Sequence, residues 1–526
     1  MKISTARVFA ALSDEIDRCR SWLGARVRDA CHYKAETLLD CLTQRIVELS
    51  LAPYNRAVHG RLKANPEDFP PSGMKIDCRR LVLHTGAGEI TITPRQFVAG
   101  QFEFLKHWIY CLTAIVAGAF RHKSAAPSVL VHNIAEEHLF PSGSDKQFIA
   151  YCRLGPIGPL TTGRRLFVAS SSAKISSEPG VFTYCRYPLI GLLLEARLGL
   201  FGRLGLLARH LVLLFEFPSQ ALRTPTLSLL GREMAYTRIA VALDNRQLIE
   251  AIVYTCDSWG VQPLWTRSLR HAKVHMIWCS QSPQSASYVF DDEKAVGPPL
   301  RWIRVDTHWV WTKALATYLR EHGHGDGDIE VVGPIVWQLP EPGHRDGQTL
   351  KLLAFDVPAV SDDIMVNVVG EITNYFHPRN LRSFITDIAA LKAPLEQALG
   401  RPVSCSLKVK RGMRLHYSAD YFEFIDQMSA SGEILPVSLS ENLYSMVSGS
   451  DLVIAYPFTS PAYLAEWLGV PAIFYDPTGS LVRNDFCELR DAVRFARGRQ
   501  ELLSMSLALL GQTDHENGHV VQSTLR

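Results

Sequence analysis

The first hundred residues show apolar positions spaced three and four apart, the spacing of one helix face. This pattern predicts helices over AETLLDCLTQRIVELSLA (35–52) and RQFVAGQFEFLKHWIYCLTAIVAGAFRH (95–122). We therefore expect a helical N-terminal region over residues 1–124, ahead of a part of the chain with a different pattern.

Short apolar runs dominate after residue 125 and indicate strands. They lie at 127–134, 164–171, 238–243, 250–256 and 273–280, and residues 302–323 read as a strand leading into a helix. The stretch EHGHGDGD (321–328) combines three glycines with alternating charges and predicts a linker.

Beyond the linker, strand and helix patterns alternate, which predicts βαβ units and a parallel sheet. Expected strands cover 329–337, 349–358, 403–410, 451–458 and 470–476, and expected helices cover 380–400 and 421–431. The fold class is thus α/β, with Rossmann-like domains over 125–322 and 329–510 that face each other across a cleft. Such sheets bind ligands at the carboxyl ends of their strands.

The most apolar segment, residues 187–217, leaves two alternatives open. It is interrupted by four charged residues, Glu195, Arg197, Arg203 and Arg209. An arginine near the bilayer centre costs ~2.5 kcal/mol or more, so the segment does not read as a membrane span. It predicts either a mostly buried helix pair with a break near Gly202, or a helix on the inner membrane surface.

Composition narrows the class of protein. The 526 residues are 47% apolar and 20% charged, with 55 basic and 52 acidic side chains. This balance argues against a nucleic-acid-binding protein. The eleven cysteines contain no CxxC pair, and acidic residues near the N-terminus argue against a signal peptide. We expect a cytoplasmic protein, peripheral at the inner membrane under the second alternative above.

The candidate chemistry centres on SGSDLVIAYPFTSPAYLAEWLGVPAIFYD (448–476). A buried strand ends at Pro457, and Ser460 followed by Pro461 predicts a helix start with a hydroxyl N-cap. The amides of that helix start, with the Thr459 and Ser460 hydroxyls, would form a phosphate site. A plain N-cap turn is the alternative.

The stretch YPFTSPAYLAEWLGVPAIFYDPTG resembles the bacterial polysaccharide-biosynthesis proteins named for their PFTS motif, and weaker likeness spans about residues 125–480. The resemblance implies a GT-B-like glycosyltransferase architecture whose C-terminal half holds the donor nucleotide. The chain also resembles, more distantly, bacterial transferases that use CMP-activated acidic sugars. Those place a hydroxyl cluster on the donor phosphate at a matching strand–helix junction.

Further donor-site candidates follow other strands of the second half. Lys408, Lys410 and Arg411 would neutralise phosphate, unless they form a solvated basic loop. His377, in NYFHPRN, is part of a His-Pro pair, and some acidic-sugar transferases have a His-Pro motif that contacts the donor. Here the pair comes after a long loop and not directly at a strand end, and a helix-start turn is the alternative. Gly333 and Pro334 would line the nucleotide pocket or form a simple turn, and Glu466 is a candidate for gripping ribose.

Transfer to a hydroxyl needs a base in the first half. Asp145 and Glu137, after the first strand there, are the candidates. No DxD motif has suitable flanks for a metal–diphosphate site, so we expect no metal and no cofactor beyond the nucleotide-sugar as substrate.

Taken with the two-domain pattern, the PFTS-motif resemblance implies a glycosyltransferase of surface polysaccharide (capsule or O-antigen) biosynthesis. It would move a hexosyl or acidic sugar from a nucleotide-sugar donor to a glycan, lipid-linked or not, at the inner membrane face. A nucleotide-sugar epimerase on the same scaffold and a non-catalytic scaffold of a synthase complex remain as alternatives.

Overall fold

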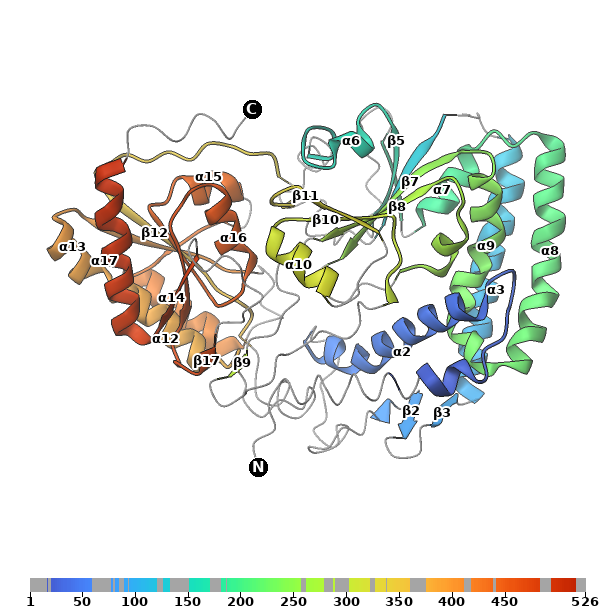
Figure 1. Cartoon of the computed structure of the whole chain (residues 1–526), viewed down its shortest axis with the longest axis horizontal. Coiled ribbons are helices and arrows are strands. Elements are labelled where there is room, and N and C mark those ends of the chain that lie inside the picture. Colours follow the sequence, from blue (N-terminus) through green and yellow to red (C-terminus); the bar gives the residue numbers. More distant parts are fainter. Residues whose placement is uncertain are drawn as a thin grey trace.

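The computed structural model of the chain contains two α/β domains that lie side by side (Figure 1). It describes residues 17, 20–58, 77–78, 81–84, 89–92, 94–120, 126–132, 151–170, 181–185, 187–256, 262–278, 287–288, 302–321, 327–336, 338–359, 375–410, 418–438, 441–482 and 493–516. The predicted α/β class is confirmed, with two Rossmann-like domains and helices ahead of the first sheet.

The first domain is built on a seven-stranded sheet whose order is β11-β10-β8-β7-β4-β5-β6. Every pairing in it is parallel. The strands are β4 (Ser128–His132), β5 (Arg165–Ser170), β6 (Val181–Cys185), β7 (Ile249–Cys256), β8 (Lys273–Trp278), β10 (Thr307–Val310) and β11 (Asp328–Val331). The chain enters the sheet at β4, builds outward through β5 and β6, and then builds outward on the other side from β7, the middle strand. The direction of winding therefore reverses between β4 and β7.

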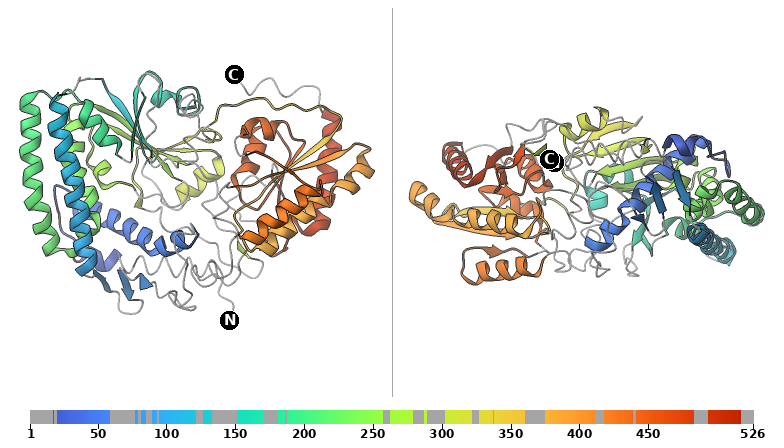
Figure 2. Two further views of the ribbon diagram at one scale, coloured as in Figure 1. Left: turned by 180° about the vertical axis from the view of Figure 1, so that it is seen from behind. Right: turned by 90° about the horizontal axis from the view of Figure 1, so that it is seen from below.

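Helices cover this sheet and extend the domain at one end (Figures 1 and 2). They are α2 (Ala35–Val58), α3 (Pro94–Ala117), α6 (Gly158–Thr161), α7 (Pro188–Glu195), α8 (Leu200–Arg223), α9 (Gly231–Asp244) and α10 (Lys313–Glu321), with 3-10 turns η2 (Gly118–Phe120), η3 (Pro225–Leu230) and η4 (Leu264–Ser268). A small antiparallel sheet joins β1 (Asp77–Cys78), β2 (Leu81–His84) and β3 (Glu89–Ile92).

The helices of the predicted N-terminal region are part of the first domain. Phe104 and Trp108 of α3 share a buried cluster with Leu213 of α8 and Met234 of α9. Because one apolar core joins these helices, the boundary expected at residue 124 does not separate two domains.

The strand expected at 238–243 is instead the end of helix α9. Its buried residues include Met234, Ala235, Ile239, Ala240 and Leu243, a helical spacing that continues upstream of the predicted range. A short apolar run alone does not distinguish a strand from a buried helix.

The apolar segment 187–217 forms α7 and the first part of α8. The break lies at Ala196–Gly199, where Gly199 has φ +65°, rather than near Gly202. Arg203 is buried and donates to the carbonyls of Ile115 (3.0 Å) and Ala196 (2.8 Å), so it closes the ends of α3 and α7. No helix in the described part of the chain is long and apolar enough to cross a bilayer.

The second domain has a six-stranded sheet in the order β14-β13-β12-β15-β16-β18, again parallel throughout. The strands are β12 (Leu350–Phe355), β13 (Val403–Lys408), β14 (Leu435–Pro436), β15 (Leu452–Ala455), β16 (Ala472–Asp476) and β18 (Val493–Arg497). The helices are α12 (Pro378–Ala389), α13 (Lys392–Leu399), α14 (Ala419–Ala430), α15 (Leu443–Ser448), α16 (Ser460–Trp467) and α17 (Gly498–Glu516). β15 and β16 are fully buried, as continuous apolar runs predict.

The crossing between the domains lies one strand later than expected. β11, predicted as the first strand of the second half, pairs with β10 of the first sheet. Its pattern of exposed and half-buried residues suits an edge strand. The predicted linker at 321–328 is thus followed by a strand that returns to the first sheet, and the chain passes to the second domain after Val331.

Contacts between the domains lie at the carboxyl edges of both sheets. β9 (Ser287–Tyr288), in the chain beyond β8, pairs antiparallel with β17 (Leu481–Val482), just beyond β16. One buried apolar cluster also contains residues of both sheets, among them Val131 and Val253 of the first and Ile454 and Phe474 of the second.

Candidate functional site

The second sheet reverses its winding between β12 and β15. The chain builds from β12 through β13 to β14 on one side, and from β15 through β16 to β18 on the other. The loops after β12 and β15 therefore diverge at the carboxyl edge, and such a point is where open α/β sheets bind ligands. The PFTS residues directly follow β15, so they lie at this switch point.

The turn after β15 holds an aromatic residue in the left-handed region. Phe458 has φ +60°, which is rare for a bulky side chain. Its ring is buried and lies 5.6 Å from that of Phe474 and 5.9 Å from that of Phe495. This packing holds the strained backbone, which turns the chain sharply from β15 into α16.

The helix start differs from the prediction by one residue. Thr459, not Ser460, is the N-cap, and Ser460 is the first helical residue. The buried Thr459 hydroxyl donates backward to the Tyr456 carbonyl (2.7 Å) and accepts no helix N–H. The hydroxyl thus shapes the turn and does not cap the helix that follows. Ser460 is half-buried.

Helix α12 begins beside the PFTS turn. Its N-cap is His377, whose Nδ1 accepts the Arg379 backbone N–H (3.1 Å). A neutral His377 therefore carries its proton on Nε2. The Tyr456 hydroxyl donates to the Tyr375 carbonyl (2.6 Å), two residues before His377. This bond connects the two strand–helix junctions across the switch point.

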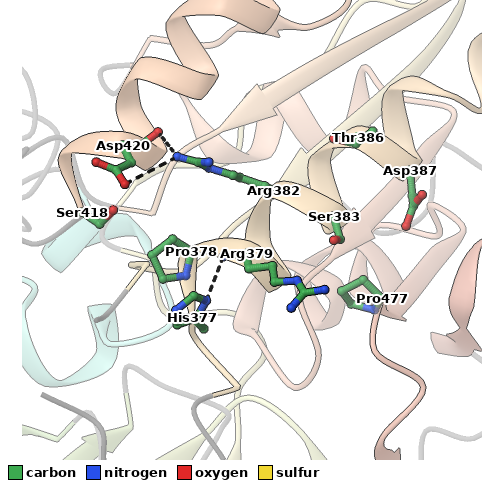
Figure 3. A pocket seen from close by; sticks show the side chains of 10 residues that line it. All are labelled: His377, Pro378, Arg379, Arg382, Ser383, Thr386, Asp387, Ser418, Asp420 and Pro477. Atoms are coloured by element: carbon green, nitrogen blue, oxygen red, sulfur yellow. Dashed lines mark hydrogen bonds and ion pairs between the residues drawn. The ribbon is translucent and has the colours of Figure 1, made fainter. Parts of the chain in front are cut away.

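A pocket of about 620 Å³ opens along the start of α12. It is lined by His377, Pro378, Arg379, Arg382, Ser383, Thr386, Asp387, Ser418, Asp420 and Pro477 (Figure 3). Arg382 donates to the Asp420 backbone carbonyl (2.7 Å), whereas no carboxylate among the described residues pairs with Arg379. The pocket thus holds the Arg379 guanidinium and the His377 imidazole beside the Asp387 and Asp420 carboxylates. Thr459 and Ser460 are not among its lining residues.

The two buried aspartates at this edge hold loops. Asp476 is fully buried and accepts from the Tyr375 hydroxyl (3.1 Å), from the Thr478 hydroxyl and amide, and from the Leu481 amide. Asp356 accepts from the Tyr421 hydroxyl (2.9 Å) and the Lys410 amide (2.7 Å). Their oxygens are engaged within the protein, so these carboxylates position the loops.

The basic candidates follow β13 as predicted. Lys408 ends the strand and donates through Nζ to the Ser438 carbonyl (2.7 Å). Burial lowers the pKa of Lys408 to about 8. Lys410 is exposed, and Arg411 lies outside the described residues. Lys408 is therefore a cation at the carboxyl edge whose pKa of about 8 lets it lose its charge in mildly alkaline solution.

Gly333, Pro334 and Glu466 lie away from the PFTS turn. Gly333 has φ +79°, and a Cβ there would come within 2.6 Å of the Trp467 ring; the Pro334 carbonyl accepts from the Tyr444 hydroxyl. Glu466 lies in the last turn of α16, and burial raises its pKa. Gly333 thus permits close packing on α16, and nucleotide contact by any of the three stays a prediction.

The first domain offers a residue at its own switch point that the sequence had not singled out. His132 ends β4, beside β7, and its ring lies 5.4 Å from that of Trp265. Its Nε2 is buried without a hydrogen-bond partner, and burial lowers its pKa to about 4. Burial keeps the imidazole neutral, so one ring nitrogen carries a lone pair, and the lowered pKa makes it a weaker base than an exposed histidine. The predicted bases Glu137 and Asp145 lie outside the described residues.

Protein families, curated proteins and solved structures show what the chain is similar to. Residues 211–505, more than half of the chain, match the family described as "Polysaccharide biosynthesis PFTS motif protein". No curated protein matches the chain significantly.

Within the described residues, no cluster of His, Cys, Asp and Glu could hold a metal ion.

Several solved structures are similar to the chain at low identity. The wall teichoic acid polymerase TagF is 9% identical, with a TM-score of 0.40 over 81% of this chain and 91% of that one. A UDP-glucose: anthocyanidin 3-O-glucosyltransferase in complex with UDP is 13% identical (TM-score 0.35; 74% and 91%). An alpha,alpha-trehalose-phosphate synthase from Burkholderia vietnamiensis is 13% identical (TM-score 0.31; 75% and 95%).

Proposed function

Because the chain belongs to the polysaccharide biosynthesis PFTS-motif family, we propose that it is a glycosyltransferase of surface polysaccharide assembly. It moves a sugar from a nucleotide-sugar donor to a glycan acceptor at the inner membrane face. The observation that carries this proposal is the pairing of two strand–helix junctions at one switch point. The His-Pro pair opens α12, the Thr-Ser pair opens α16, and the Tyr456–Tyr375 hydrogen bond joins them.

The second domain would hold the donor. The first-turn amides of α16, the His377 Nε2–H and the Arg379 guanidinium are all groups that stabilise negative charge. Charge develops on the donor phosphate when its bond to the anomeric carbon breaks. Donors already fixed in place stabilise that charge without reorganisation, which is the usual source of catalytic power in such sites.

The first domain would bind and activate the acceptor. The acceptor hydroxyl oxygen forms the new bond to the anomeric carbon, and its proton goes to a base. His132 is our choice for that base because its unpartnered Nε2 lies at the switch point of the first sheet. Glu137 and Asp145 follow the same strand and are the alternatives from the sequence. The β9–β17 pairing supports an arrangement in which both carboxyl edges face one reaction space.

The test has two stages. A panel of UDP-, CMP-, GDP- and dTDP-sugars is first screened for a rise in melting temperature, because a ligand that binds only the folded state stabilises it. Release of free nucleotide on adding a glycan acceptor is then measured. We expect His377→Ala to abolish the melting shift, because it removes both a donor and the N-cap of α12. His344→Ala, an exposed histidine at the opposite edge of the second sheet, is the matched control and should keep it.

The outcomes separate the proposed transferase from its competitors. Nucleotide release that depends on acceptor supports transfer. An isomerised nucleotide-sugar without acceptor would show an epimerase, and the absence of nucleotide binding across the panel would show a non-catalytic scaffold.

A further inference from the structure

Exposed apolar side chains are concentrated on one end of the first domain. Of the eighteen large apolar residues that are exposed in the described part of the chain, six lie on α3, one on η2 and seven on α8. They are Val98, Phe102, Leu105, Ile109, Tyr110, Val116, Phe120, Leu200, Phe201, Leu204, Leu211, Val212, Phe215 and Leu222. We call this set the α3–α8 face. Phe201, Phe215 and Phe120 are the most exposed, at 87%, 76% and 88%.

The two helices are antiparallel neighbours, and their apolar stripes run together. Trp108 of α3 donates to the His210 carbonyl of α8, and His210 Nε2 donates back to the Trp108 carbonyl. The rings of Phe104 and Phe217 pack at a tilt with their centroids 4.5 Å apart, and Arg203 donates to the Ile115 carbonyl. Residues 104, 108 and 115 of α3 thus lie opposite 217, 210 and 203 of α8. Both helices stand at the outer end of the domain (Figures 1 and 2).

Each stripe has the spacing of a helix that is half immersed. On α3 the exposed residues recur at 98, 102, 105, 109 and 116, and on α8 at 204, 211, 215 and 222. The opposite face of each helix is buried against the domain, including Phe104, Leu206 and Leu213. Each helix has 24 residues and is therefore about 36 Å long. An apolar surface of that extent is unusual on a protein that contacts water alone.

The charges around the face indicate which partner covers it. Arg95, Arg197, Arg209 and Arg223 are exposed, and none has a carboxylate partner among the described residues. The acids on these helices are already paired, Glu103 with Lys106 and Glu216 with Arg238. An apolar stripe with unpaired arginines at its border fits the interface of an anionic bilayer, where side chains enter the acyl boundary and arginines meet headgroups.

We propose that the α3–α8 face docks the protein on the surface of an anionic lipid bilayer. The sequence had pointed only to residues 187–217 for such a contact, and the structure changes the assignment. Of that segment, α7 is mostly buried, and α3, a hundred residues earlier in the chain, provides the other half of the surface. Docking would hold the enzyme beside acceptors that are anchored in the same bilayer. Lipid binding does not require sugar transfer, so the two proposals fail separately.

The experiment is flotation of the full chain with vesicles of phosphatidylcholine alone and with added phosphatidylglycerol. We expect binding to the anionic vesicles that weakens with salt. Phe201→Ser with Phe215→Ser should lower the partition coefficient by roughly a hundredfold, about tenfold for each ring. Arg209→Gln with Arg223→Gln should lower it by roughly fivefold per arginine on anionic vesicles only.

Leu435→Ser is the matched control, because Leu435 is 51% exposed on the edge strand of the second domain. It should leave flotation unchanged. The proposal is overturned if no vesicle binds the chain, or if Leu435→Ser weakens binding as much as the double phenylalanine variant. It is also overturned if that variant instead converts a lipid-free dimer into a monomer, since the face would then bind a second copy. Should the phenylalanine variant not fold, the arginine variant and the salt dependence decide.

Discussion

The two sheets have the same pattern of winding, but the side chains at their switch points differ in hydrogen bonding. In the second domain, Tyr375, Tyr456 and Asp476 are joined by hydrogen bonds, and every one of these side chains is buried. In the first domain, His132 occupies the corresponding place on β4 with its Nε2 unpartnered. Under the proposed function, the hydrogen-bonded edge of the second domain would hold the donor phosphate, and the unpartnered imidazole of the first domain would take the proton of the acceptor. The donor and acceptor sides are thus parts of that proposal.

The largest expected effect tests the acceptor side. His132→Ala should lower kcat by about 10²–10⁴-fold, the usual contribution of a general base. The free energy of unfolding should change little through hydrogen bonding, because Nε2 has no partner to lose. Nucleotide-sugar affinity should be unchanged. An unchanged kcat together with lost activity in Glu137→Gln or Asp145→Asn would move the base to the following loop.

The next effect tests the rigidity of the donor side. Asp476→Ala leaves the Tyr375 hydroxyl and the Thr478 and Leu481 amides without their acceptor. The Tyr375 and Leu481 donors are buried, whereas Thr478 is exposed to water. An unmet buried donor costs about 1–3 kcal/mol, so the free energy of unfolding in urea should fall by about 2 kcal/mol or more. Asp451→Ala, a half-buried carboxylate at the amino edge that accepts the Lys351 amide, should cost less. Equal losses would mean that the switch point is no more firmly held than the rest of the sheet.

The smallest effect is a pH dependence of donor binding. Burial lowers the pKa of Lys408 to about 8, so its folded-state pKa lies below the unfolded value. A bound phosphate would favour the charged form and raise that pKa. Nucleotide affinity should then be constant below about pH 8 and fall up to tenfold per pH unit above it. Lys408→Arg, which stays charged, should abolish this fall in a calorimetric titration. A fall that persists in this variant would exclude Lys408 from the donor site.

Local pattern was sufficient for much of the second domain. The runs at β12, β13, β15 and β16 are continuous or alternating apolar segments, and the strand–turn–helix around Pro457 to Gly469 formed as expected. Pattern failed where burial was complete, as in α9, because a wholly apolar stretch carries no period to separate helix from strand. The sequence pattern also placed β11 in the wrong sheet, because the residues of an edge strand do not indicate which sheet the strand joins.

For the candidate site, motifs in the sequence pointed to His377 and to the Thr459–Ser460 pair, and ligand contact by these residues stays a prediction. The sequence assigned the Thr459 hydroxyl to a ligand, whereas in the fold it donates to the Tyr456 carbonyl. His132 carried no motif at all. Its interest comes from an unpartnered nitrogen and a position at the switch point of the first sheet, which are properties of the folded chain.

By itself the sequence determined the α/β class, the strand–helix junction of the PFTS motif and the apolar character of residues 187–217. Each depends on neighbours within one or two helical turns. Only the tertiary structure decided that the winding of both sheets reverses at β4 and β12, that the junctions of α12 and α16 meet, and that α3 joins α8 in one exposed face. Those features unite segments a hundred residues apart, and which segments meet is fixed by the burial of shared apolar surface rather than by any local preference.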